Sequence, residues 1–212
     1  MIYGHYTDCN AVPVFCLWQN GTWLIIPYFT LFIWYNVHMN ITGKVEIMER
    51  IVVYTSSTGF TKQYAEWIAE DLQCEAVELK NVTEEKISQY DMVIFGGWIM
   101  GNAINGLQKL TEMNPKELAV FAVGATPDEI APKDVIIESN HLEEVPFFYM
   151  VGGFRFKELN FAIRAMLKGL RKSAAKKANK TEQEAFMAEA LGTTFDNSDK
   201  KYIQPLVEFV TK

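Results

Sequence analysis

The chain of 212 residues is 49% hydrophobic and 22% charged, with a formal net charge of −6 and a pI near 5.2. This balance supplies enough apolar side chains for the hydrophobic core of one globular domain. An acidic chain is poorly suited to phosphate backbones, so the composition argues against non-specific nucleic-acid binding. The three cysteines, Cys9, Cys16 and Cys74, are too few and too scattered for a disulfide framework, and their spacing matches no metal site.

Residues 1–47 differ in composition from the rest of the chain, because they are rich in aromatic residues and poor in charge. Their most apolar run, residues 23–37, is shorter than the ~20 residues that a transmembrane helix needs, and it contains Pro27. No Lys or Arg precedes Lys44, so the basic start of a secretory signal is missing. Two interpretations remain: a weak membrane-associated hairpin, or a translated leader ahead of a protein that begins at Met48.

The leader hypothesis, which we favour, depends on residues 43–47, Gly-Lys-Val-Glu-Ile. These residues can be encoded by a purine-rich stretch that resembles a bacterial ribosome-binding site, directly ahead of the codon for Met48. A gene sequence without that purine run would remove the main support for the hypothesis. On this interpretation residues 1–47 are a hydrophobic extension outside the fold, and residues 48–212 form the folded domain.

From Met48 onward, short apolar runs alternate with segments of helical periodicity. In chain order, the expected elements are a strand at 50–55, a helix at 62–72, a strand at 75–79, a helix capped by Thr83, a strand at 91–97, a loop at 98–102, a helix at 104–113, a strand at 117–124, a loop at 125–127, a helix at 135–140, a strand at 145–151, a helix at 158–172, a loose or helical stretch at 176–184 and a helix at 202–211. Strands that alternate with helices in this way predict an α/β domain with a doubly wound parallel sheet and helices on both faces.

The loop after the first strand carries the strongest chemical signal. Four hydroxyl residues, Ser56, Ser57, Thr58 and Thr61, surround Gly59 directly ahead of a helix. Unpaired backbone N–H groups, the positive end of the helix dipole and small hydroxyl side chains together suit a phosphate. The loop lacks the lysine-containing pattern of nucleoside triphosphatases and the three-glycine pattern of dinucleotide sites. The alternative is a turn in which Ser and Thr only satisfy the start of the helix.

This loop resembles the phosphate-binding fingerprint of the flavodoxin family, Ser/Thr-x-Thr-Gly-x-Thr. The six matching residues are Ser56, Ser57, Thr58, Gly59, Phe60 and Thr61. The match is complete and lies between the expected first strand and first helix, and the resemblance covers most of the chain from Met48. It implies a flavodoxin-like five-stranded parallel sheet of order 2-1-3-4-5, and an FMN whose phosphate lies in this loop.

The resemblance also implies that the flavin ring lies between the loops that follow the third and fourth strands. The residues concerned are Gly97, Trp98, Ile99, Met100, Gly101, Asn102, Gly124, Ala125, Thr126 and Pro127. Trp98 is expected to stack on the ring, or else to cover the core at the sheet edge, while Gly97 and Gly101 allow the backbone to approach the ring. The tyrosine common after the fourth strand in this family is replaced by Ala125, Thr126 and Pro127, which argues against tight sandwiching of the ring.

The chain continues beyond the fifth strand in a way that a typical flavodoxin does not. Residues 158–172 form a basic helix, and residues 194–199 precede the last helix, a layout similar to the flavodoxin-type protoporphyrinogen oxidases. That branch is membrane-associated and passes electrons from a porphyrinogen to a quinone. On the functional interpretation, four cations of this part of the chain contact anionic lipid or porphyrin propionates. The alternative is that they only form a solvated helix face. They are Arg155, Arg164, Lys168 and Arg171.

The same helix carries an apolar stripe that the sheet can bury. Its members are Leu159, Ile163, Met166, Leu167 and Leu170. His141 is the only histidine from Met48 onward, and no nucleophile or metal-ligand cluster accompanies it, so any reaction must depend on the cofactor.

Three functions remain open on these residues. The first is a cytoplasmic FMN protein that carries electrons between redox partner proteins. The second is a protoporphyrinogen or quinone oxidoreductase that uses the same FMN, with peripheral membrane contact through residues 158–172. The third, from another class, is a flavin-free module in which the first loop holds some other anion.

Overall fold

The structure is a computed structural model, and it describes residues 14–19, 22–27, 48–159, 161–176 and 179–212. The chain divides into two units, Met1–Ile47 and Met48–Lys212. In the first unit, β1 (Val14–Gln19) and β2 (Thr22–Pro27) pair antiparallel. The hairpin and leader hypotheses concern residues 1–47, most of which lie outside the described residues. Among the described residues, no helix is both long enough and apolar enough to cross a membrane.

The second unit is built on a parallel sheet. Its strands are β3 (Arg50–Tyr54), β4 (Glu75–Glu78), β5 (Met92–Met100), β7 (Glu117–Gly124) and β8 (Phe147–Val151). They lie in the order β4-β3-β5-β7-β8, and every neighbouring pair is parallel. In chain order this arrangement is 2-1-3-4-5, so the predicted doubly wound, flavodoxin-like fold is confirmed.

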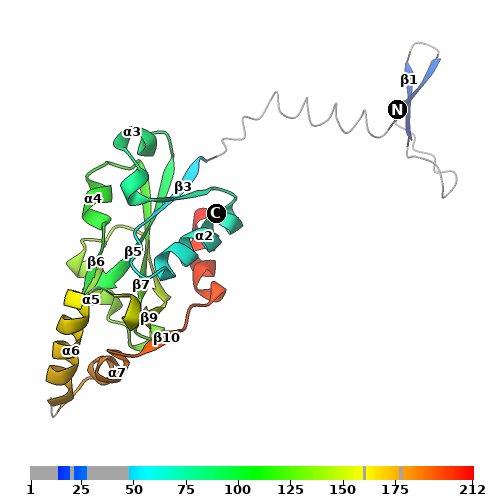
Figure 1. Ribbon diagram of the computed structural model, residues 1–212. Coiled ribbons are helices and arrows are strands. Elements are labelled where there is room, and N and C mark those ends of the chain that lie inside the picture. Colours follow the sequence, from blue (N-terminus) through cyan, green and yellow to red (C-terminus); the bar gives the residue numbers. More distant parts are fainter. Residues whose placement is uncertain (1–13, 20–21, 28–47, 160, 177–178) are drawn as a thin grey trace. The chain divides into compact units, whose positions relative to one another are not determined.

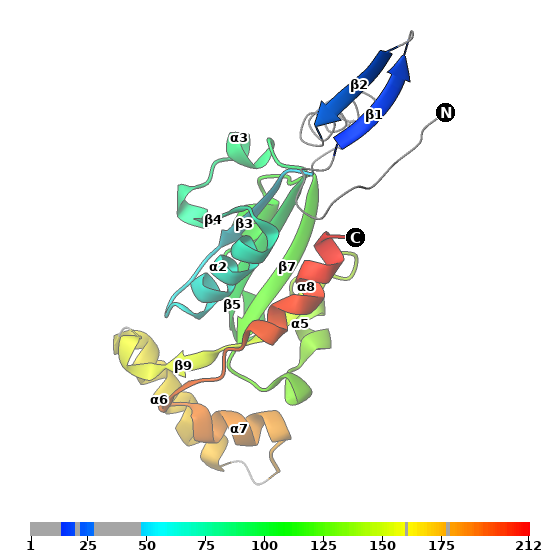
Figure 2. The same cartoon turned by 90° about the vertical axis from the view of Figure 1, so that its right-hand side faces the viewer.

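Helices cover both faces of the sheet (Figures 1 and 2). They are α2 (Phe60–Leu72), α3 (Glu84–Ile87), α4 (Leu107–Thr111), α5 (Lys133–Ser139) and α8 (Gln204–Val210). Tyr64 and Ile68 of α2 and Leu206 of α8 are buried against one face. Leu110 of α4 and Ile136 of α5 belong to the core on the opposite face. Successive strand residues point to opposite faces, so residues 51–54 of β3 are all buried and contribute alternately to the two cores.

The third strand is longer than its sequence predicts. Residues 98–100, expected as part of a loop, continue β5 and pair antiparallel with the short strand β6 (Ala103–Ile104). The prediction of a loop at 98–102 is therefore wrong for its first three positions. Gly96 and Gly97 predict the end of the strand, but Trp98 and Ile99 have high strand propensity and extend it into a hairpin. The expected helix at 104–113 is correspondingly shorter, since α4 begins only at Leu107.

Beyond β8 the chain forms a segment whose strands the sequence did not predict. The strand β9 (Gly153–Arg155) pairs antiparallel with β10 (Thr194–Asp196), and between them in the chain lie α6 (Phe161–Lys176) and α7 (Glu182–Ala190). We call β9, α6, α7 and β10 together the cap. Figure 1 shows these elements gathered at one end of the domain. The helix predicted at 158–172 corresponds to α6, and the stretch described as loose or helical contains the start of α7, which Thr181 caps.

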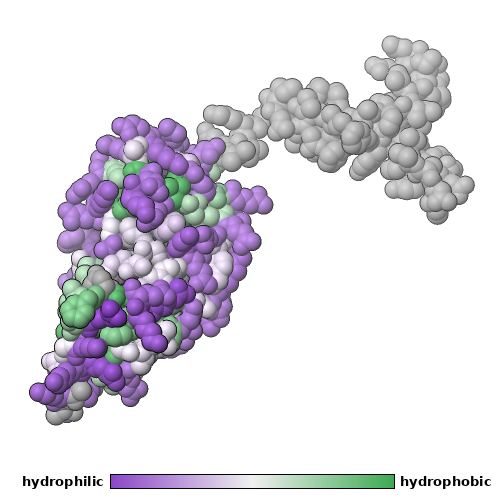
Figure 3. Space-filling view, viewed as in Figure 1, coloured by the Kyte–Doolittle hydropathy of each residue, from purple (hydrophilic) through white to green (hydrophobic). Residues whose placement is uncertain are grey.

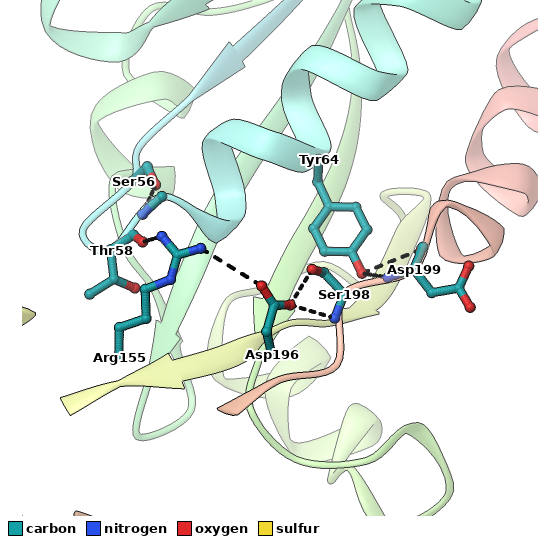
Figure 4. Close-up of polar contacts among 8 residues, drawn as sticks. Ser56, Thr58, Tyr64, Arg155, Asp196, Ser198 and Asp199 are labelled. Atoms are coloured by element: carbon teal, nitrogen blue, oxygen red, sulfur yellow. Dashed lines mark hydrogen bonds and ion pairs between the residues drawn. The ribbon is translucent and has the colours of Figure 1, made fainter. Parts of the chain in front are cut away.

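A buried tyrosine joins the start of the cap to the body of the domain. The Tyr64 hydroxyl, on α2, donates a hydrogen bond to the Val151 carbonyl oxygen at 2.5 Å. It accepts one from the Asp199 amide at 3.0 Å (Figure 4). Burial raises the pKa of Tyr64 well above the usual value of a phenol, so the hydroxyl keeps its proton. The end of β8 and the chain that follows β10 are thus both fastened to α2.

We expect Tyr64→Phe to lower the free energy of unfolding by about 1–3 kcal/mol, because the buried Val151 carbonyl oxygen and the partly buried Asp199 amide both lose this partner. Urea unfolding followed by circular dichroism measures the change. Tyr202→Phe, in a half-buried tyrosine, is the matched control and should have the smaller effect. Equal losses in the two variants would contradict the role given to the Tyr64 hydroxyl.

Candidate functional site

A cavity of about 380 Å³ lies where the carboxyl ends of the parallel strands meet the cap. Its first group of lining residues is Ser56, Ser57, Thr58, Phe60 and Thr61. The second group is Trp98, Ile99, Met100, Gly101 and Asn102, and the third is Gly124, Ala125 and Thr126. The structure thus brings together three segments that the sequence proposed as one site. Of the residues proposed there, Gly59, Gly97 and Pro127 do not line the cavity.

The first loop connects β3 to α2 and is closed by one internal hydrogen bond. The Gly59 amide donates to the Ser56 Oγ at 3.1 Å, and Gly59 adopts a φ of +94°, which glycine tolerates far better than other residues. Gly59 is also the N-cap residue of α2, and it has no side chain that could accept a hydrogen bond from the first turn of the helix. That turn contains no acidic residue. Capping of α2 by serine and threonine therefore does not explain this loop. The amides that open α2 keep the anion-binding character of a helix start.

The cap places a cation against this loop (Figure 4). Arg155, the last residue of β9, donates from Nη1 to the Thr58 carbonyl oxygen at 2.7 Å. Its guanidinium group lies 4.4 Å from the centre of the Phe60 ring, and Nη2 lies 3.7 Å from the Asp196 Oδ2. The loop itself contains no Lys or Arg, and no local sequence pattern indicates that β9 returns to it. In sequence, Arg155 belongs to the basic run that continues through α6; the structure separates it from that run.

The loop expected after the third strand of the sheet, at residues 98–102, is part of the β5–β6 hairpin. Trp98, near the end of β5, is half-buried and lines the cavity, as do Met100 and Gly101. Gly97 has a different role from the one expected. A Cβ at this position would lie 2.5 Å from the Ile104 Cγ2 and 2.7 Å from the Asn105 carbonyl oxygen. Gly97 is therefore required by the close packing of the hairpin, and not by the approach of a ligand.

Sequence reasoning missed an aromatic residue beside the third loop. Tyr149 of β8 lines the cavity, is 9% exposed and donates from its hydroxyl to the Thr126 carbonyl oxygen at 2.7 Å. Burial raises the pKa of Tyr149 far above the usual value of a phenol. Residues 125–127 contain no aromatic side chain, but the neighbouring strand supplies one at the same place. The local pattern around Tyr149 predicts only a core residue in a buried strand, so it does not indicate a position beside the cavity.

The sequence predicts that the apolar stripe at residues 159–170, most of which lies in α6, packs on the sheet, and this prediction is wrong. Its members line the cavity together with Met187 of α7 and with Leu191. Met166 and Leu170 remain 47% and 51% exposed, and Phe161 at the start of α6 is 79% exposed. Figure 3 shows apolar side chains reaching the surface near α6, beside strongly hydrophilic ones. One wall of the cavity is thus apolar and supplied by the cap.

We expect Gly97→Ala to lower the free energy of unfolding by about 1–3 kcal/mol, because the added methyl group overpacks the hairpin. Gly169→Ala is the matched control: a Cβ there meets no atom within 4 Å, and Gly169 lies in α6. Alanine is the better helix former, so the control should gain up to about 1 kcal/mol. A Gly97→Ala protein as stable as the parent in thermal unfolding would show that the hairpin has room for the methyl group.

Comparisons with known proteins identify the family of this chain through a domain model. A family model described as a flavodoxin domain matches residues 51–181. Among solved structures, a flavodoxin from the domain Archaea is 22% identical over 49% of this chain and 78% of its own, with a TM-score of 0.38. Flavodoxin 2 from Bacillus cereus is 23% identical over 47% of this chain and 77% of its own, with a TM-score of 0.35.

A flavoprotein from Lactobacillus acidophilus NCFM, whose structure was solved in complex with FMN, is 14% identical over 49% of this chain and 92% of its own, with a TM-score of 0.34. No curated protein matches the sequence. The family model spans more than half of the chain and includes the first loop, β5, β7, β8 and α6. The chain therefore belongs to the flavodoxin domain family.

Proposed function

We propose that this protein binds FMN non-covalently in the cavity beneath the cap and passes electrons through it. The observation that carries the proposal is the convergence of the complete fingerprint loop with two further strand-end loops on one cavity. In open α/β sheets, ligands bind beyond the carboxyl ends of the strands, where this cavity lies. The membership of the chain in the flavodoxin domain family supports the same conclusion.

The first loop fits the phosphate end of FMN. Ser56, Ser57, Thr58 and Thr61 line the cavity with small hydroxyl groups, and the start of α2 adds backbone amides. Thr61 is 1% exposed, so a hydrogen bond from its hydroxyl to a phosphate oxygen would form away from bulk water. Charge-assisted hydrogen bonds of this kind are stronger than neutral ones.

The opposite part of the cavity fits an aromatic ring. Trp98 and Tyr149 supply aromatic surface from two strands, and the cap supplies aliphatic side chains. Stacking and apolar contact would hold the isoalloxazine ring and exclude water from it. FMN, when bound, supplies the reversible uptake and release of electrons, while the chain binds and orients it. The cavity-lining backbone of the β5–β6 hairpin is the part of the chain that we expect to tune the potential.

We expect Thr58→Val and Thr61→Val each to weaken FMN binding by roughly tenfold or more, since one hydrogen bond to a charged group contributes about 1.5–3 kcal/mol. Titration of flavin-free protein, followed by FMN fluorescence, measures both dissociation constants. Thr111→Val is the control, because Thr111 is exposed in α4 and does not line the cavity. Parent-like binding in both loop variants would overturn the phosphate assignment.

The first test of the proposal as a whole is the absorbance spectrum of the purified protein. A yellow protein that releases FMN on denaturation supports it. A colourless protein that also fails to bind added FMN would favour the flavin-free anion-binding module. Anaerobic titration of the FMN-loaded protein then gives the potentials that an electron carrier must share with its partner proteins.

A second candidate function is protoporphyrinogen or quinone oxidoreduction by the same FMN. The apolar wall formed by α6 and α7 favours it, because a large apolar substrate could lie against that wall beside the flavin. The porphyrinogen would be oxidised and the quinone reduced. Steady-state oxidation of protoporphyrinogen with a quinone acceptor separates this enzyme from a simple carrier, for which no turnover is expected.

Membrane docking through α6 accompanies this second candidate. Arg164, Lys168 and Arg171 lie on α6 with the exposed Phe161, a combination of basic and apolar groups suited to anionic lipid. If α6 docks, neutralising the three cations should abolish co-sedimentation with anionic vesicles at physiological salt, at about 1 kcal/mol per residue. Absence of binding by the parent protein would instead support the freely diffusing carrier.

A further inference from the structure

The first loop has no charge of its own to offer a phosphate. Residues 56–61 contain no Lys or Arg, and the chain as a whole carries a formal net charge of −6. A phosphate monoester carries close to two negative charges at neutral pH. Among the described residues that line the cavity, Arg155 is the only Arg or Lys. The positive charge beside the first loop therefore comes from one side chain of the cap, that of Arg155.

The geometry holds the guanidinium group of Arg155 close against the loop. Nη1 bonds to the Thr58 carbonyl oxygen at 2.7 Å, and the same nitrogen lies 3.0 Å from the position that a Cβ of Gly59 would take. The central carbon of the guanidinium group lies over the Phe60 ring, 4.4 Å from its centre. Arg155 thus contacts Thr58 and Phe60 and lies close beside Gly59, three successive residues of the fingerprint.

The contacts of Arg155 leave it suited to a second, anionic partner. A guanidinium group has five N–H donors in a planar fork, and one bond to a carbonyl oxygen engages only one of them. Asp196 is the neighbouring anion, but its Oδ2 is 3.7 Å from Nη2, longer than a hydrogen bond. The Arg155 side chain is 33% exposed, so its charge is partly shielded from water and yet reachable from the cavity that it lines.

We propose that Arg155 is the specificity-determining residue for the phosphate, which it recognises directly by charge-assisted hydrogen bonds while it holds the loop through Thr58. This inference rests on the proposed function and extends it. Neutral loop donors can bind either a phosphate or a hydroxyl group, whereas a fixed guanidinium favours the dianion. Arg155 thus makes the site select phosphorylated flavin over riboflavin.

The test is a comparison of FMN and riboflavin binding to the full-length, flavin-free protein. Arg155→Gln should weaken FMN binding by at least about tenfold and leave the dissociation constant of riboflavin within about twofold. Arg155→Lys keeps the charge but not the fork, so its preference for FMN should be intermediate. The control is Lys157→Gln, which removes the same charge from an exposed position two residues away, outside the cavity lining, and should match the parent.

Equal weakening of FMN and riboflavin in Arg155→Gln would overturn the proposal, because it would show that Arg155 only shapes the loop. Unchanged binding of both flavins would overturn it as well. If Arg155→Gln does not fold, Arg155→Lys decides: a preference for FMN identical to that of the parent would show that the fork has no part in recognition.

A flavin-independent measurement separates this inference from the proposed function. Inorganic phosphate should raise the thermal midpoint of the flavin-free parent, because a ligand that binds only the folded state stabilises it. The same concentration should raise the midpoint of Arg155→Gln much less. If the parent binds no flavin at all, the electron-transfer proposal fails, while this arm still tests Arg155. Equal phosphate stabilisation in parent and variant would overturn the role of Arg155.

Discussion

The parallel register of the sheet is the constraint from which the site follows. Tyr54 at the end of β3 lies beside Gly96, and Trp98 lies beside Val123 near the end of β7. Strands that run in the same direction and are paired this closely must release their following loops at the same edge. The sheet itself therefore brings the three strand-end segments of the cavity together, and the cap adds the remaining wall. Apolar cores on both faces hold the register, because a slip by one residue would turn each core side chain towards the wrong face.

The sequence predicts this part of the molecule well, for physical reasons. Strands buried on both faces are short apolar runs, and the alternation of such runs with helices admits few topologies. The fingerprint loop is local as well, since its six residues are contiguous in the chain. For β7 at Glu117–Gly124, even the predicted ends of the strand are right.

The parts that the sequence did not predict depend on contacts between distant residues. Arg155 and Thr58 are 97 residues apart in the chain, and the pairing of β9 with β10 spans the whole of α6 and α7. Three-residue strands carry too little pattern to be recognised before their partner is known. Tyr149 shows the same limit, because periodicity identifies a buried residue but not the cavity beside it. The stripe of α6 was identified correctly as apolar, but periodicity cannot say what covers it.

The pairing of Arg155 with Thr194 has a topological consequence. The chain leaves the body of the domain at β9 and returns at β10 beside the point of departure, so α6 and α7 form a closed excursion whose ends meet. An excursion of this kind can change in length and in surface chemistry without shifting any strand of the sheet. The contact of Arg155 with the Thr58 carbonyl oxygen is made at the base of this excursion, and not by the helices above it. On the function proposed above, recognition of the flavin phosphate would fall to the base of the excursion and contact with a redox partner to the exposed surface of its helices.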